Sequence, residues 1–251
     1  MNTLYSPQCN ENRPAVIGFP GFVHSSEPTR IDNHLKKLSE YGILGIRLNY
    51  PGIELKNGSK LIECNYNLSN FVQHAQETFE MLQDMGVDTS RIGLLDSSIG
   101  SGIAGNWLAR NTIWNPACKV SISPLPGWPY FASPHVRWSI EKSAVDVNIS
   151  SSRDKLNGVK RVIKQASIEN LIRTDALEAL RNSQSRHKIP MMSVIGMKDE
   201  KVSPESMEAH HNYFADPDNS VKIMLPEPHD IPEEKYESEA IDFFKRYLLN
   251  F

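Results

Sequence analysis

The chain has 251 residues, a mass of 28.4 kDa, 39% apolar residues and 23% charged residues, values typical of one large globular domain with or without an inserted cap. This composition argues against long disordered segments. The formal net charge of −3 gives no support to nucleic-acid binding through bulk positive charge.

Six short apolar runs alternate with amphipathic stretches along the chain. Continuous apolar runs are typical of strands buried on both faces, and apolar positions three or four apart are typical of helices. The alternation predicts right-handed crossovers and a three-layer α/β fold, in which helices cover both faces of a mostly parallel sheet of about six strands. The expected strands are 15–19, 43–48, 91–95, 118–122, 191–195 and 221–225, and the expected helices are 31–41, 68–85, 99–108 and 231–249.

Residues 124–188 interrupt this alternation. We expect no strand between Ser123 and Lys188, because the first part is rich in proline and aromatic residues and 154–181 looks helical. We interpret 124–188 as a helical cap inserted into a core of 1–123 and 189–251; a plain extra helical layer is the alternative. Three aromatic side chains in this segment either line a substrate pocket or simply pack: Trp128, Tyr130 and Phe131.

Charge is unevenly distributed in the second half of the chain. Residues 151–190 carry nine Lys or Arg and four Asp or Glu, whereas 199–240 carry three Lys and twelve Asp or Glu. Such asymmetry is commonly just solvated surface. The functional interpretation is a basic cap that receives an anionic substrate or an acidic carrier protein.

The cysteines and the N-terminus bear on the compartment. Cys9, Cys64 and Cys118 are widely spaced and include no CxxC pair, which argues against a disulfide framework and a structural zinc site. Residues 1–13 are polar and lack the features of a secretory signal. No apolar run approaches the roughly 18 residues that a membrane span needs. We therefore expect a cytoplasmic protein without a membrane span.

The strongest local signal is at 94–102, where the apolar run Leu-Leu leads through Asp-Ser-Ser into Ile-Gly-Ser-Gly and a helix. This context is typical of a nucleophile elbow, a turn so sharp that the residues two before and two after the nucleophile come close together. Ser98 is the candidate nucleophile because it lies at the junction and Gly100 follows two residues later. Ser97 and Ser101 compete for the role, and a helix N-cap is the structural alternative for Ser98.

A serine hydroxyl needs a base within hydrogen-bond reach and an acid that orients the base. Asp199 follows the strand 191–195 and His229 follows the strand 221–225, so both lie in loops at the same sheet edge as Ser98. Their structural alternatives are a surface-turn aspartate and a loop histidine between prolines. Three other histidines are less favoured as the base, because their loops do not follow the last strand: His24, His135 and His187.

An oxyanion needs backbone N–H donors that are already in place. Ile99, directly after Ser98, supplies one of them. The loop after the first strand supplies the second, which we assign to Phe22, because Gly21 lets the backbone approach closely.

In these motifs and their order, the chain resembles the α/β-hydrolase superfamily. The resemblance covers most of the chain: residues 18–24, 47–52 and 88–93, the elbow, and the loops of Asp199 and His229. It implies the α/β-hydrolase fold and a triad in the chain order Ser98, Asp199, His229. Such a triad works through an acyl-enzyme intermediate.

Some positions depart from the superfamily pattern. Asp96 stands where glycine is usual, Pro20 where histidine often precedes the glycine, and Asn49 where aspartate is frequent. Only about a dozen residues precede the first expected strand, too few for the usual opening hairpin. None of these departures removes a member of the triad.

We expect a serine hydrolase that cleaves a carboxylic ester or thioester, with an acyl thioesterase as the preferred form. An acyltransferase with the same triad, a peptidase of the same fold and a non-catalytic binding protein are alternatives. The expected partner is a small-molecule acyl group, with coenzyme A or acyl carrier protein as candidate carriers; no cofactor, metal or nucleic acid is expected. The adjacent His210 and His211 resemble a metal pair only superficially, since neighbouring helix residues face different directions.

Overall fold

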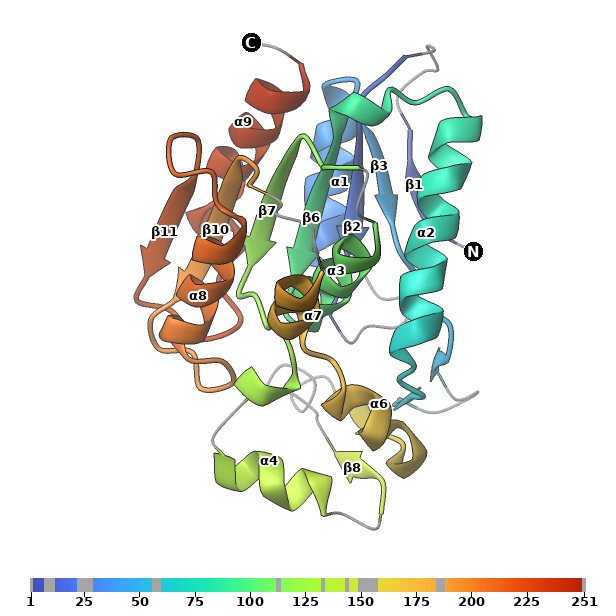
Figure 1. Ribbon diagram of the computed structural model, residues 1–251, viewed down its shortest axis with the longest axis vertical. Coiled ribbons are helices and arrows are strands. Elements are labelled where there is room, and N and C mark those ends of the chain that lie inside the picture. Colours follow the sequence, from blue (N-terminus) through green and yellow to red (C-terminus); the bar gives the residue numbers. More distant parts are fainter. Residues whose placement is uncertain are drawn as a thin grey trace.

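A seven-stranded sheet lies at the centre of the part of the chain that the computed structural model describes, residues 2–6, 12–21, 29–55, 60–111, 114–131, 134–142, 145–148, 158–183 and 188–249 (Figure 1). Six of its strands are parallel, and the edge strand β1 (Thr3–Tyr5) runs antiparallel to β3 (Leu44–Arg47). In sheet order the strands are β1 (Thr3–Tyr5), β3 (Leu44–Arg47), β2 (Ala15–Phe19), β6 (Ile92–Ser97), β7 (Cys118–Ile122), β10 (Met191–Gly196) and β11 (Val221–Leu225).

Helices cover both faces of this sheet (Figure 1). Successive residues of an inner strand alternate between the faces, so Val16 and Ile17 belong to the apolar clusters on opposite sides of the sheet. The predicted three-layer α/β fold and its six strands are thereby confirmed. One face carries α1 (Arg30–Glu40) and α9 (Glu237–Leu248), and the other carries α2 (Leu68–Asp84), α3 (Ile99–Arg110), α8 (Pro204–Phe214) and α7 (Ala176–Asn182), which packs against α3.

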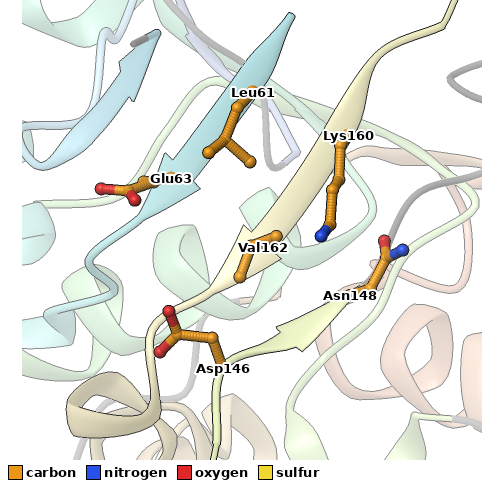
Figure 2. A pocket seen from close by; sticks show the side chains of 6 residues that line it. All are labelled: Leu61, Glu63, Asp146, Asn148, Lys160 and Val162. Atoms are coloured by element: carbon orange, nitrogen blue, oxygen red, sulfur yellow. The ribbon is translucent and has the colours of Figure 1, made fainter.

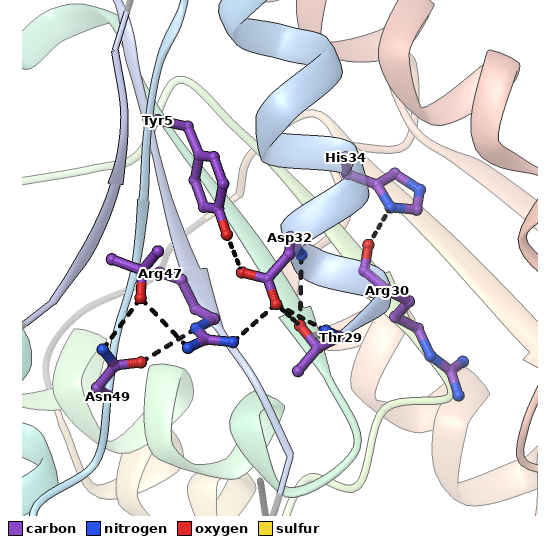
Figure 3. Close-up of polar contacts among 8 residues, drawn as sticks. Tyr5, Thr29, Arg30, Asp32, His34, Arg47 and Asn49 are labelled. Carbon is purple, nitrogen blue, oxygen red and sulfur yellow. Dashed lines mark hydrogen bonds and ion pairs between the residues drawn. The ribbon is translucent and has the colours of Figure 1, made fainter. Parts of the chain in front are cut away.

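The edge strand β1 is held by a buried polar network (Figure 3). Arg47 on β3 donates from Nη1 to Asp32 Oδ2 at 2.7 Å and from Nη2 to Thr3 Oγ1 at 3.2 Å. The Tyr5 hydroxyl donates to the other oxygen of Asp32, and Asp32 also forms a capping box with Thr29 at the start of α1. A three-residue strand fixed by such contacts leaves no apolar pattern in the sequence. It therefore adds one strand to the six that we predicted.

A second sheet joins the segment after β3 to the expected cap. Its strands β4 (Ile53–Leu55) and β5 (Leu61–Cys64) are antiparallel, β5 pairs in parallel with β9 (Lys160–Ile163), and β9 pairs with β8 (Val147–Asn148). The expectation of no strand between Ser123 and Lys188, with 154–181 helical, is therefore wrong at β8 and β9. Both strands are very short, and β9 begins with two charged residues, so neither forms an apolar run.

The rest of the expected cap is helical. Its helices α4 (Pro134–Glu141) and α6 (Ile168–Ile172) lie with β8 beyond the carboxyl ends of the parallel strands, where a cap is expected (Figure 1). The expected helix at 231–249 forms as a 3₁₀ turn, η4 (Glu233–Lys235), followed by α9. Three further 3₁₀ turns are η1 (Thr89–Arg91), η2 (Trp128–Tyr130) and η3 (Gln165–Ser167). Within the described ranges, no helix is both long enough and apolar enough to cross a membrane.

A pocket of about 170 Å³ lies on the second sheet (Figure 2). Lys164 Nζ contacts Asp146 at 2.6 Å and Glu63 at 3.3 Å beside it. The pocket is formed by β5, β9 and the segment around β8, and not by the loops that carry the expected triad. Its lining residues are Leu61, Glu63, Asp146, Asn148, Lys160 and Val162.

The adjacent histidines of α8 contact different partners. His210 is fully buried, with Nε2 3.1 Å from Lys119 Nζ, whereas His211 Nδ1 lies 2.9 Å from Ser193 Oγ on β10. Burial, together with the Lys119 cation, lowers the pKa of His210 well below its ordinary value. Burial, together with the Lys222 cation, lowers the pKa of His211 to about 4. Both rings are therefore neutral in the folded protein at neutral pH.

These depressed histidine pKa values make stability depend on pH. Below about pH 6.5 the unfolded chain binds protons at His210 and His211 that the folded chain does not, so the free energy of unfolding falls as the pH falls. For His211 this loss develops between about pH 6.5 and pH 4. We expect His211→Gln to remove about 1 kcal/mol of the stability lost between pH 6 and pH 5. Urea unfolding at both pH values measures this difference, and an unchanged pH slope in the variant would contradict it.

Candidate active site

The structure brings Ser98, Asp199 and His229 together at the carboxyl edge of the main sheet. Ser98 directly follows β6, Asp199 lies in the turn after β10, and His229 lies in the loop after β11. His229 Nε2 is 3.0 Å from Ser98 Oγ, and His229 Nδ1 is 2.6 Å from Asp199 Oδ2. A proton on Nδ1 satisfies the carboxylate and leaves the Nε2 lone pair to accept from the serine hydroxyl.

The turn at Ser98 has the geometry of a nucleophile elbow. Ser98 has φ 53° and ψ −129°, a backbone conformation that is strained for a residue with a side chain. A Cβ at Gly100 would lie 2.1 Å from the carbonyl oxygen of Phe19 and 2.6 Å from that of Pro20, so no other residue fits there without displacement. The loop after β2 therefore passes directly against the start of α3.

The serines of the elbow have different contacts. Ser98 precedes α3, yet its side chain makes no helix-capping hydrogen bond and faces His229 instead. Ser101 is fully buried, and its hydroxyl donates to Asp96. Among the three serines of the elbow, Ser98 is thus the one that contacts the histidine.

Asp199 is oriented by its own turn. Its Oδ1 accepts hydrogen bonds from the backbone N–H groups of Lys201 at 2.8 Å and Val202 at 3.0 Å, while Oδ2 faces His229. The carboxylate side chain is fully buried, unlike that of a surface-turn aspartate. This arrangement fixes one carboxylate oxygen in the turn and points the other at the imidazole.

Ser123 is a positioning residue that the sequence analysis missed. Its hydroxyl donates to the backbone carbonyl of His229 at 2.7 Å, and its φ is 45°. It directly follows β7, so it anchors the histidine loop from the strand between those that precede Ser98 and Asp199. A serine at a strand end is too common for its sequence context to have indicated this contact.

The departure at Asp96 is accommodated by a buried ion pair. Asp96 Oδ2 lies 2.9 Å from Lys119 Nζ on β7, and both side chains are fully buried. Lys119 Nζ also contacts His210 and lies 4.3 Å from the centre of the Phe214 ring. Burial lowers the pKa of Lys119, and the charge of Asp96 opposes this shift. Asp96 therefore does not leave an unbalanced charge beneath the nucleophile.

Of the two predicted oxyanion donors, Ile99 lies within the described residues. Ile99 is the first residue of α3, where backbone N–H groups have no partner within the helix. Phe22 and the neighbouring His24 lie outside the described residues. Gly21 is described, and a Cβ there would meet Ser98 Cβ at 3.5 Å, so the loop that leads to Phe22 passes beside the elbow.

The aromatic residues of η2 pack beside the acid turn. Trp128 is buried, and its ring stacks on that of Phe131 with 5.3 Å between the ring centres. Its Nε1 donates to Glu141 Oε1 at 2.7 Å. Phe131 forms a backbone bridge with Val202, next to Asp199. Tyr130 and Phe131 are partly buried against the main apolar cluster. These contacts show how Trp128 packs, and the bridge to Val202 connects Phe131 to the turn that holds Asp199.

No protein-family model and no curated protein matches the chain by sequence. Solved structures match its fold. The α/β hydrolase GrgF from Penicillium sp. sh18 has a TM-score of 0.71 at 14% identity, covering 98% of this chain and 93% of that chain. The monoacylglycerol lipase of Paleococcus ferrophilus has a TM-score of 0.69 at 15% identity, covering 98% of each chain.

A third similar structure is Est1E from Butyrivibrio proteoclasticus with ferulic acid bound. It has a TM-score of 0.70 at 16% identity, and the match covers 99% of this chain and 95% of that chain. Identities this low establish the fold alone. Together with the sheet order and the elbow geometry, these matches show that the chain has the α/β-hydrolase fold.

Proposed function

We propose that this protein is a serine hydrolase that cleaves a carboxylic ester or thioester. The observation that carries the proposal is the continuous contact from Ser98 Oγ through His229 to the buried Asp199 carboxylate, at 3.0 Å and 2.6 Å. This is the arrangement that activates a serine hydroxyl, because the base can take the proton while the acid stabilises the resulting imidazolium.

The reaction follows from these contacts. His229 Nε2 takes the Ser98 proton as Oγ bonds to the acyl carbon, and backbone N–H groups at Ile99 and the proposed Phe22 position bind the oxyanion. The bond to the leaving alcohol or thiol then breaks, and His229 returns the proton to it. A water molecule, deprotonated by His229, attacks the acyl-enzyme and releases the free acid and Ser98.

The substrate class is a second part of the proposal. The structural neighbours include a protein named as a monoacylglycerol lipase and one holding ferulic acid, which supports ester chemistry. The basic composition of 151–190 supports an anionic carrier, so we propose an acyl thioester of coenzyme A or acyl carrier protein as substrate. An acyltransferase would use the same triad, with an alcohol or amine in place of water.

The test is labelling with a fluorophosphonate probe, which reacts with activated serines whatever their substrate. We expect the wild type to label on Ser98, Ser98→Ala to lose labelling, and Ser97→Ala to retain it as the matched control from the same turn. The modified peptide is identified by mass spectrometry. Absence of labelling in the wild type would favour a non-catalytic binding protein.

A panel of acyl esters and thioesters then defines the reaction. Free acid as the product supports hydrolysis, whereas acyl transfer to an added alcohol or amine would identify a transferase. A preference for p-nitrophenyl esters over coenzyme A thioesters would contradict the proposed thioesterase activity. The proposal of a carboxylesterase would remain.

A further inference from the structure

The contact between α1 and the segment that follows His229 contains a histidine and two glutamates. Three polar contacts connect the two segments: Arg30 with Asp230 at 3.1 Å, Asn33 with Glu233 at 2.8 Å, and the ion pair of Lys37 with Glu237. His34 lies on the same helix between these contacts. Its ring stacks on that of Tyr236, with 5.5 Å between the ring centres and 15° between the planes.

The tautomer of His34 is set by its backbone contact. The side chain is fully buried, and Nδ1 lies 2.6 Å from the carbonyl oxygen of Arg30 (Figure 3). A carbonyl oxygen only accepts, so Nδ1 carries a proton and donates it. The other nitrogen, Nε2, then has a free lone pair, and it is buried without a hydrogen-bond partner among the described residues. Metal-binding histidines typically donate their second ring nitrogen to a carbonyl or carboxylate in this way.

Two carboxylates face this histidine. The ligand atoms of His34, Glu233 and Glu237 all lie within 4.8 Å of one another. A nitrogen lone pair close to two carboxylates forms a set of donors that favours a divalent cation. Both glutamates are only half-buried, which gives an ion a path from solvent and lets their side chains close around it.

We propose that His34, Glu233 and Glu237 bind a divalent cation of the zinc class. An imidazole nitrogen favours zinc and its neighbours over calcium or magnesium, and two carboxylate oxygens with one water would complete four-coordination. Closure to zinc–ligand distances of about 2.0–2.2 Å requires the two glutamate side chains to move inward. The ion would tie α1 to the segment that begins four residues after the catalytic-base candidate His229.

Two cations near the site oppose this binding. Arg30 lies one helical turn before His34 on α1, so its positive charge is close to the site. The Lys37 ammonium donates a hydrogen bond to one carboxylate oxygen of Glu237. A carboxylate has a second oxygen with free lone pairs, so the Lys37 contact weakens zinc binding without blocking it. We therefore expect Lys37→Met to tighten zinc binding, an effect that a simple ion-pair network would not show.

The experiment is titration of the chelator-treated protein with zinc chloride by calorimetry, with the unfolding temperature measured in parallel. We expect one zinc per chain, a higher unfolding temperature with zinc, and affinity reduced by at least about tenfold in His34→Gln and in Glu237→Gln. His74→Gln is the matched control, because His74 also lies beside a glutamate, 3.8 Å from Glu77, and its side chain is half-buried on α2.

Each alternative outcome is decisive. Equal zinc affinity in wild type and Glu237→Gln, whose change lies on a half-buried side chain and leaves the core intact, would overturn the proposal. Loss of binding in His229→Gln with retention in His34→Gln would place the ion at the triad and also overturn it. The proposal does not depend on Ser98 being reactive, because the titration measures binding and unfolding only.

Discussion

Asp199→Asn should lower kcat for ester hydrolysis by about 10⁴-fold while the protein stays folded. The side-chain oxygen of asparagine can still accept from the Lys201 and Val202 N–H groups, so the turn is retained. Its amide nitrogen then faces His229 Nδ1 and donates to it. This forces the ring proton onto Nε2, where the imidazole can no longer accept a proton from Ser98.

Steady-state kinetics with a p-nitrophenyl ester, beside thermal unfolding, measures this effect. Asp216→Asn is the matched control, because Asp216 also accepts a turn hydrogen bond, from the backbone N–H of Asp218, while its other oxygen accepts from the Asn219 side chain and not from a histidine. We expect the control to keep wild-type kcat. Retention of more than about a tenth of the wild-type kcat in Asp199→Asn would show that Asp199 does not orient the base.

Lys119→Met should destabilise the fold by about 3–5 kcal/mol, because it leaves the Asp96 carboxylate buried without its ion-pair partner. Asp96 sits two residues before Ser98, so the loss acts directly on the elbow. The double variant Asp96→Leu with Lys119→Met removes both charges, and we expect it to regain most of the lost stability.

Urea unfolding of the single and double variants forms a thermodynamic cycle that isolates the pair. Lys222→Met provides the control, because Lys222 pairs with Glu208 at 3.2 Å while about a third of its side chain is exposed. We expect that control to change stability by less than about 1 kcal/mol. A Lys119→Met variant as stable as this control would contradict the expected cost of breaking the buried ion pair.

The five inner strands of the main sheet were predictable because burial on both faces imprints continuous apolar runs on the sequence. The common location of the loops with Ser98, Asp199 and His229 was predictable from these strands, because the carboxyl ends of parallel strands meet at one edge of the sheet. The structure brings those side chains together, while their catalytic role stays a proposal. The Phe22 donor stays a prediction, because that residue lies outside the described ranges.

Other features left no pattern to read. The strands β1, β8 and β9 have two to four residues each, fewer than a period-two pattern needs to stand out. Lys119 looks in the sequence like a polar interruption of an apolar strand, and only the fold shows that it pairs with Asp96. Long-range polar contacts such as Ser123 with His229 depend on where strands lie in the sheet, which a local pattern does not contain.

The parallel pairing of β5 with β9 also bears on the order in which the chain folds. Lys164 and Glu63, which join the ends of these strands, are 101 residues apart, whereas β6 and β7 are linked through the single helix α3. Closing the longer loop loses more chain entropy before any contact compensates for it. We expect the nucleophile elbow and its neighbouring strands to form first. The pairing of β5 with β9 should form later in refolding.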